Sequence, residues 1–97
     1  MAVTVLLDLH TKAGRGDELE EFLAKILPDS RAFDGCIELR VVRNQDDPEH
    51  IVVIERWESR AHHEAYFAWR VEEGTLAAAL DYLETQPVFR YFDPSDA

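Results

Sequence analysis

The order of strand-like and helix-like hydrophobic patterns constrains the fold of this chain more than any other feature. Short segments in which apolar residues alternate or run together are typical of strands, and apolar residues at every third and fourth position are typical of helices. The strand patterns cover residues 3–10, 36–43, 51–57 and 88–92. Helical patterns separate the first strand from the second and the third from the fourth. The sequence therefore predicts the order βαββ(αα)β.

An apolar stripe marks the first helix. It consists of Leu19, Phe22, Leu23, Ile26 and Leu27, spaced as on one helical face. Asp17 is the predicted N-cap, and Glu20 follows three residues later as in a capping box. Residues 28–33 are expected to continue this helix with a kink at Pro28, and Gly35 ends the segment.

Three residues mark the ends of the later helices. Ser59 is the predicted N-cap of a helix that runs to about Glu73, and Gly74 ends it. Thr75 is the predicted cap of a short third helix with leucines along one side. These leucines are Leu76, Leu80 and Leu83.

Two crossovers around a central hairpin predict a ferredoxin-like, split βαβ arrangement. This is an α+β fold with a four-stranded antiparallel sheet and its helices on one face. We expect residues 1–97 to form a single domain of this kind, with residues 93–97 as a frayed tail.

Both faces of the predicted sheet carry apolar side chains. Alternation puts Leu7, Val53 and Trp57 on one face, Leu6, Val52 and Ile54 on the other, and Ile37, Leu39 and Val41 on a common face. The helices can cover only one face, and a bare apolar face of several hundred Å² is an association site. We therefore expect a homodimer formed sheet to sheet.

Composition and charge exclude several classes of partner. Ten Lys and Arg against twenty Asp and Glu give a net charge of -10, which argues against binding to nucleic acid or an anionic membrane. No apolar run approaches the roughly 20 residues of a membrane helix, so no membrane partner and a cytoplasmic location are expected. Cys36 is the only cysteine, which excludes an internal disulfide and a cysteine metal cage. No base lies near it in sequence, so Cys36 is not predicted to be a nucleophile.

Several short motifs, in this order and spacing, resemble the antibiotic-biosynthesis-monooxygenase (ABM) family. They are Gly14-Arg15-Gly16-Asp17 before the first helix, Gly35-Cys36, Asp47-Pro48, and the run Glu55-Arg56-Trp57-Glu58-Ser59. The resemblance covers nearly the whole chain. It implies a dimeric α/β barrel with a pocket between the sheet and the helices. Some members of this family oxygenate phenolic polyketides with molecular oxygen, without flavin or metal, and many others have no established reaction.

Glu55 and Trp57 are two residues apart on one predicted strand and so share a face. On the helix side, a carboxyl group beside an indole in an apolar pocket should have a raised pKa, as a general base near neutral pH requires. We predict Glu55 as this base and Trp57 as a stacking surface for substrate, because relatives line their pocket with the matching tryptophan. The alternative is that Glu55 pairs with Arg40 or Arg43 on the neighbouring strand, with Trp57 as core filler.

Five polar or aromatic residues share one broad face of the second predicted helix. They are His62, His63, Tyr66, Trp69 and Arg70. Many relatives have a histidine where this chain has Tyr66, so we predict His63 for proton transfer, Tyr66 for positioning an oxygen atom, and His62 and Trp69 for substrate binding. The alternative is an amphipathic helix whose aromatic side chains are core and whose histidines lie at its edge.

The sequence predicts no cofactor and no metal. It contains no glycine-rich phosphate loop, and the two adjacent helical histidines diverge by about 100°. His10 and His50 lie next to strand ends and are expected to be solvated. Haem-degrading relatives carry an asparagine on the first strand, where this chain has only apolar residues on the relevant face, so haem degradation is disfavoured.

Together these features favour a cofactor-independent monooxygenase of a small aromatic or quinol-like molecule. Two alternatives remain. One is a non-catalytic dimeric barrel that binds a metabolite or serves in assembly. The other is an isomerase on the same scaffold, because proton abstraction without oxygen needs the same groups.

Overall fold

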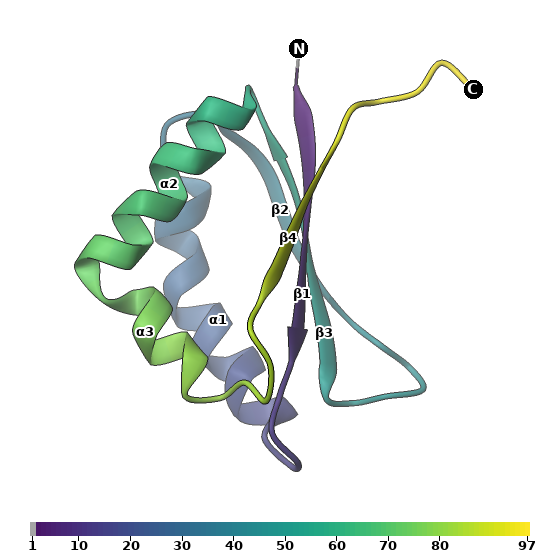
Figure 1. The fold of residues 1–97 in the computed structure, drawn as a ribbon, viewed down its shortest axis with the longest axis vertical. Coiled ribbons are helices and arrows are strands. Elements are labelled where there is room, and N and C mark those ends of the chain that lie inside the picture. Colours follow the sequence, from purple (N-terminus) through teal and green to yellow (C-terminus); the bar gives the residue numbers. More distant parts are fainter. Residues whose placement is uncertain (1) are drawn as a thin grey trace.

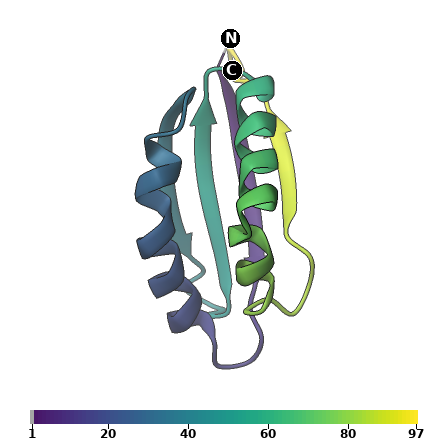
Figure 2. The ribbon, with the colours of Figure 1, turned by 90° about the vertical axis from the view of Figure 1, so that its left-hand side faces the viewer.

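The computed structural model describes residues 2–97 and has the predicted order of elements. The elements are β1 (Val3–His10), α1 (Gly16–Arg31), β2 (Cys36–Arg43), β3 (His50–Trp57), α2 (Arg60–Glu73), α3 (Thr75–Leu80) and β4 (Val88–Phe92). All neighbouring strands pair antiparallel, in the order β2-β3-β1-β4. The three helices lie on one face of this sheet, with α1 beside α2 and α3 (Figures 1 and 2). This is the ferredoxin-like α+β fold that the sequence predicts.

Helix α1 starts earlier than predicted. Asp17 is not its N-cap, because the helix begins at Gly16 and Arg15 precedes it without a side-chain cap. Gly16 packs so closely against the β2–β3 hairpin that a Cβ there would clash with the carbonyl of Pro48. Asp17 instead lies in the first turn and pairs with Arg43 of β2 at 2.7 Å, which ties the start of the helix to the sheet. At its other end, the helix continues through Pro28.

The later helices meet at a single residue. The Ser59 hydroxyl accepts a hydrogen bond from the His62 backbone N–H at 3.1 Å, which confirms the predicted N-cap of α2. Gly74 ends α2 with a left-handed φ of 94°. It also occupies the N-cap position of α3, so Thr75 is not a cap but the first helical residue. The two helices leave no linker residue that could serve as a separate cap.

A β-bulge changes the predicted faces of β2. Cys36 lies opposite Trp57 and Glu38 lies opposite Arg56, which leaves Ile37 as the extra residue. Ile37 is 47% exposed and does not share the inner face with Leu39. Simple alternation could not reveal this insertion.

The face of the sheet toward the helices carries the core, and the other face remains open. Inward residues of β1 and β3 such as Val5, Val53 and Trp57 are almost fully buried. On the open face, Val42, Val88 and Phe92 are exposed. Leu6, Val52 and Ile54 are half-buried there. In the part of the chain that the structure describes, no helix is long and apolar enough to cross a membrane.

Candidate functional site

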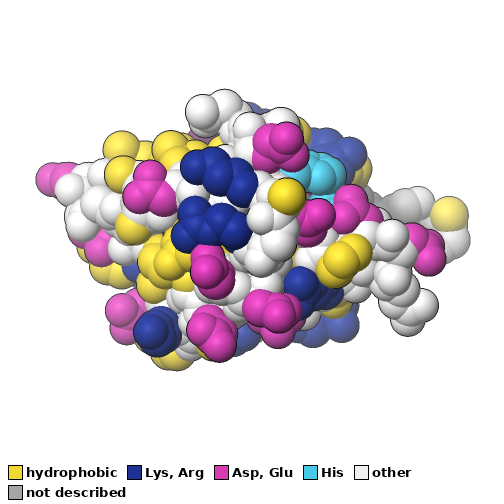
Figure 3. All heavy atoms as spheres, turned by 90° about the horizontal axis from the view of Figure 1, so that it is seen from below, with side chains coloured by type: hydrophobic (Ala, Val, Ile, Leu, Met, Phe, Trp, Pro, Cys, Tyr) yellow, Lys and Arg dark blue, Asp and Glu magenta, His cyan; other side chains and the backbone are white. Residues whose placement is uncertain are grey.

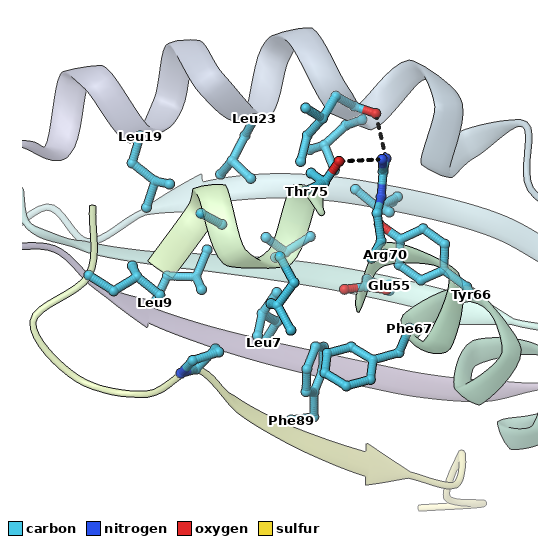
Figure 4. A pocket seen from close by; sticks show the side chains of 18 residues that line it. Leu7, Leu9, Leu19, Leu23, Glu55, Tyr66, Phe67, Arg70, Thr75 and Phe89 are labelled. Carbon is cyan, nitrogen blue, oxygen red and sulfur yellow. Dashed lines mark hydrogen bonds between the residues drawn. The ribbon is translucent and has the colours of Figure 1, made fainter. Parts of the chain in front are cut away.

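A pocket lies between the inner face of the sheet and the helices. It contains about 650 Å³ of free space, including the part that is open to solvent. Its walls are mostly apolar, with Leu7 and Leu9 on β1, leucines of α1, and the rings of Phe67 and Phe89 (Figure 4). The polar lining side chains belong to Glu55, Tyr66, Arg70 and Thr75. A largely apolar cavity with a few fixed polar groups is the usual form of a small-molecule site.

Among the described residues, Glu55 is the one carboxylic acid in the lining of this pocket. Its side chain points inward from β3 and is only 2% exposed. The indole Nε1 of Trp57 donates a hydrogen bond to Glu55 Oε1 at 2.8 Å. Burial raises the pKa of Glu55 to about 7, and this effect outweighs the opposite effect of the Trp57 hydrogen bond.

The alternative arginine partners of Glu55 are engaged elsewhere. Arg40 pairs with Glu38, and Arg43 pairs with Asp17. Arg40 projects from the opposite face of the sheet, since it lies beside Ile54 in the register. The predicted pairing of Glu55 with Arg40 or Arg43 is therefore wrong, and Glu55 keeps its carboxyl group free of a cationic partner.

His63 lies directly beside Glu55. Its ring is fully buried, and its Nε2 is 3.7 Å from Glu55 Oε1 without a hydrogen-bond partner. Its Nδ1 is 2.8 Å from the hydroxyl of Tyr91 on β4. Burial lowers the pKa of His63 to about 4, so the imidazole is neutral at pH 7. His63, which the sequence analysis predicts for proton transfer, thus lies beside the predicted base, whereas Tyr91 is predicted only as part of the strand at residues 88–92.

Tyr66 and Arg70 form the other polar cluster of the pocket. The Tyr66 hydroxyl is 2.6 Å from Ser30 Oγ of α1. Arg70 donates to Tyr66 Oη at 3.1 Å, Ser30 Oγ and the Ile26 carbonyl at 2.8 Å, Glu73 at 3.4 Å and Thr75 Oγ1 at 3.5 Å. All five N–H groups of the guanidinium thus have an acceptor. The sequence places Arg70 on the helix face that lies toward the sheet, but predicts no function for it. No pattern in the sequence points to Ser30.

Trp57 does not line the pocket, contrary to prediction. It is fully buried behind Glu55, with its ring centroid 5.0 Å from that of Tyr66 and 5.5 Å from that of His63. Its indole holds the carboxylate instead of offering a face to a ligand. Phe67 and Phe89, with ring centroids 4.8 Å apart, are the aromatic residues in the lining other than Tyr66.

His62 and Trp69 also lie outside the pocket lining. The ring of His62 packs against Gly35, and its Nδ1 is 2.6 Å from Ser59 Oγ. Trp69 packs against Phe33 and under the guanidinium of Arg70. Neighbouring helical side chains point about 100° apart. His63 therefore faces the sheet and His62 does not, so the predicted substrate-binding role of His62 and Trp69 is not supported.

Among residues 2–97, two clusters of potential metal ligands lie away from the pocket. The ligand atoms of Asp8, His10 and His50 lie within 4.8 Å of one another, and those of Asp34, Glu58 and His62 do so as well. Histidine side chains also gather next to acidic ones on the end of the molecule in Figure 3.

The first cluster has an explanation without a metal. His50 is not fully solvated as predicted, because its Nε2 is 2.9 Å from Asp8 Oδ1 and its Nδ1 is 3.1 Å from the Asn44 amide. The other oxygen of Asp8 binds Arg90. The rings of His10 and His50 are stacked with an interplanar angle of 3°. Because nitrogen lone pairs lie in the ring plane, these parallel rings do not converge on one ion.

Comparison with known proteins identifies the relatives of this chain. The family model described as antibiotic biosynthesis monooxygenase matches residues 2–71. A crystal structure of an antibiotic biosynthesis monooxygenase is similar, with a TM-score of 0.84 and 18% identity over 96% of this chain and 98% of that one. None of the curated proteins matches significantly.

Two further solved structures share the fold. A conserved protein from Methanosarcina mazei Go1 has a TM-score of 0.87 and 14% identity over 98% of this chain and 94% of its own. The Rv0793 protein from Mycobacterium tuberculosis has a TM-score of 0.78 and 20% identity over 100% of this chain and 98% of its own. At these identities the likeness concerns the fold.

Proposed function

The chain belongs to the antibiotic biosynthesis monooxygenase family, and on this basis we propose that it is a cofactor-independent monooxygenase of a small, electron-rich phenol. The observation that carries the proposal is Glu55: a buried carboxyl group in an apolar pocket, with a pKa of about 7. A group with this pKa is half ionised at neutral pH and therefore suited to accept a proton from a bound phenol.

In the proposed reaction the phenol itself is the reductant. Glu55 accepts the hydroxyl proton, and the electron-rich phenolate reacts with molecular oxygen at a ring carbon that carries hydrogen. One oxygen atom becomes the new carbonyl of a quinone, the other leaves as water, and the substrate supplies the four electrons and both hydrogens. The atoms balance, because a phenol and a molecule of oxygen together give a quinone and a molecule of water.

Each part of the pocket has a task in this scheme. The Trp57 N–H holds the carboxylate of Glu55 in one orientation. The leucines and the rings of Phe67 and Phe89 exclude water from the reactive anion. The hydroxyl of Tyr66 is held by Ser30 and Arg70, which fixes the tyrosine ring at the pocket wall and supports a positioning role.

The proposal is tested in two stages. A thermal-shift screen of catechols, naphthols, hydroquinones and anthrones identifies binders, and oxygen uptake is then measured with each. We expect Glu55→Gln to lower turnover by about 10²–10⁴-fold while the binder still shifts the melting temperature. Glu72→Gln, which changes an exposed glutamate of α2 outside the pocket lining, is the matched control and should retain activity.

The alternatives give different results. Exchange of a substrate C–H with deuterium without oxygen uptake would indicate an isomerase, and binding without either reaction would indicate a non-catalytic module. Loss of uptake on dialysis against a chelator would contradict the cofactor-independent reaction.

We also propose that two copies pair through the open face of the sheet. Exposed Val42 and Val88 and half-buried Leu6, Val52 and Ile54 give this face an apolar character in the isolated chain. Ile54→Lys should separate the dimer, because an unpaired charge would enter a desolvated interface. Sedimentation velocity should give twice 11.2 kDa for the parent protein and for the helix-surface control Ala68→Lys, and a single chain for Ile54→Lys. A parent protein that sediments as one chain at micromolar concentration would contradict the dimer.

A further inference from the structure

We infer that His63 and Tyr91 are positioning residues that form a proton path from Glu55 to the protein surface; the inference rests on the proposed role of Glu55 as base. The three side chains form a continuous line. Glu55 lines the pocket, His63 Nε2 is 3.7 Å from Glu55 Oε1, and His63 Nδ1 is 2.8 Å from Tyr91 Oη. Tyr91 is half-buried on β4, an edge strand of the sheet.

The unpartnered nitrogen of His63 is the observation that points to this path. Buried side-chain nitrogens nearly always have a hydrogen-bond partner, yet His63 Nε2 has none in the part of the chain that the structure describes, and it faces the carboxyl group of Glu55. A movement of about 0.8 Å would shorten this separation to a normal hydrogen bond of about 2.9 Å. The gap is thus small enough to close by an ordinary side-chain adjustment.

A second route for the proton is needed when a ligand fills the pocket. Glu55 is only 2% exposed even in the empty pocket, so its access to water is through the space that the substrate would occupy. The reaction itself releases no net proton, because the proton that Glu55 takes from the phenol ends in the water that is formed. About half of the molecules, however, carry a proton on Glu55 at pH 7, and once the substrate has bound, this proton must leave before Glu55 can act as the base. The line through His63 leads away from the pocket, toward the half-buried edge strand.

A proton can move along this path because the ring of His63 changes from one neutral tautomer to the other. When Glu55 is protonated, it donates to the lone pair of His63 Nε2, and Nδ1–H donates to Tyr91 Oη. Transfer moves the Glu55 proton to Nε2, the Nδ1 proton to Tyr91, and the Tyr91 hydroxyl proton to water. Glu55 is then a carboxylate that accepts from Nε2–H, and Nδ1 accepts from the Tyr91 hydroxyl. One proton has left, and no residue of the path has stored a charge.

The surroundings keep the side chains of His63 and Tyr91 neutral. Burial lowers the pKa of His63 to about 4 and raises the pKa of Tyr91 above its usual value. Besides Glu55, which raises the pKa of Tyr91 when it is ionised, two charged side chains act on both groups: Glu64, and Arg60, whose guanidinium lies 4.0 Å from the centre of the Tyr91 ring. These two charges act in opposite directions on each pKa.

The tautomer of His63 provides a direct test. In protein labelled with ¹⁵N at histidine and ¹³C at the glutamate carboxyl, nitrogen and carboxyl shifts are followed from about pH 4 to about pH 9. We expect Nδ1 of His63 to carry the hydrogen below the midpoint of Glu55 and Nε2 to carry it above, so that the two ¹⁵N shifts exchange places at that midpoint. His62, which does not contact Glu55, is the internal control and should show no such exchange. In Glu55→Gln the exchange should be absent.

A second variant tests the outer end of the path. Tyr91→Phe retains the ring but removes the acceptor of Nδ1–H, so His63 should keep its hydrogen on Nε2 over the whole range. Tyr82→Phe, a half-buried tyrosine in another part of the fold, should leave the exchange unchanged. Once a substrate has been identified, Tyr91→Phe should lower kcat and leave KM unchanged.

The outcomes separate this inference from the proposed function. If Glu55 titrates near pH 7 while His63 keeps one tautomer throughout, the proton path is overturned, and the proposed role of Glu55 as the base is retained. The path is also overturned if Tyr91→Phe leaves the tautomer exchange intact. If Glu55 titrates at its ordinary value of 4.5 and the exchange occurs there, the path stands and the near-neutral base of the proposed function fails.

Discussion

Two polar clusters on the inner side of the sheet differ in how completely their hydrogen bonds are satisfied. Arg70 is buried, and each of its five N–H groups has an acceptor, among them Ser30 and Tyr66. Glu55 and His63 are at least as deeply buried, yet the carboxyl group receives one hydrogen bond, from Trp57, and His63 Nε2 receives none. Arg70 therefore holds elements together, while Glu55 and His63 keep unused capacity to bind or release a proton.

The difference shows how a small domain separates stability from reactivity. A buried charge with all its partners in place stabilises one packing arrangement and does not react. A buried acid without a cation has its pKa shifted toward neutrality, at a cost to stability at higher pH. Helix α2 contributes to both clusters, with Arg70 near its end and His63, the neighbour of Glu55, near its start.

Arg70→Met should give the largest effect, because it leaves the Tyr66 hydroxyl, Ser30 Oγ and the Ile26 carbonyl without their shared donor. We expect a loss of about 3 kcal/mol in the free energy of unfolding, measured by urea denaturation at pH 8. Glu55→Gln at the same pH should cost less than about 1 kcal/mol or stabilise the protein, since it removes a buried charge.

Arg60→Met on the same helix is the control for the lost charge. The Arg60 side chain is 62% exposed and should contribute little. An equal loss of stability for the Arg70 and Arg60 variants would show that the two clusters do not differ as described.

The pH dependence of stability should reveal Glu55 and His63 as opposing groups. The raised pKa of Glu55 stabilises the fold below pH 4.5, and this contribution is lost as the pH rises to about 7. The lowered pKa of His63 stabilises the fold above pH 6.5, and this contribution is lost as the pH falls to about 4. Each shift corresponds to about 3 kcal/mol, and the two nearly cancel between these limits.

Single variants should remove this cancellation. Relative to the parent protein, Glu55→Gln should gain about 3 kcal/mol of stability between pH 4.5 and pH 7. His63→Asn should lose about as much, relative to the parent, between pH 4 and pH 6.5. Urea unfolding at several pH values measures both differences. Differences that stay constant with pH would mean that neither group is shifted in the folded state.

The periodic patterns of the sequence predict the fold and the orientation of Glu55. Glu55 and Trp57 share the inner face because strand side chains alternate, and the structure agrees. The face of Ile37 and the cap at Asp17 were predicted wrongly, because both depend on contacts distant in sequence. Ile37 is displaced by the register against β3, and the helix start near Asp17 is set by packing on the hairpin.

The site is only partly predictable for the same reason. Helical phase places both His63 and Tyr66 toward the sheet, but it does not tell which of them reaches Glu55. The partners Ser30 and Tyr91 come from α1 and β4, and no local pattern relates either of them to α2. Trp57 was predicted on the correct face, yet its burial behind Glu55 depends on how Tyr66 packs against it.

The smallest predicted effect concerns the single hydrogen bond to Glu55. Trp57→Phe removes the N–H donor, and a hydrogen bond of about 1 kcal/mol corresponds to a rise of about 0.7 in the pKa of Glu55. Trp69→Phe, which changes the other indole but not this hydrogen bond, should leave the pKa unchanged. The carboxyl ¹³C shift of Glu55 measures both values. An equal midpoint in the two variants would mean that the Trp57 hydrogen bond does not act on the ionised carboxylate.

The most direct test of the account is the protonation state of Glu55 itself. The infrared C=O stretch of a protonated carboxyl group can be isolated by subtracting the spectrum of Glu55→Gln from that of the parent protein at each pH. We predict a band that is present at pH 6, has half its intensity near pH 7 and disappears by about pH 8. A difference spectrum without this band at pH 6, with Glu55 fully ionised at that pH, would contradict the assignment of Glu55 as the base of the pocket.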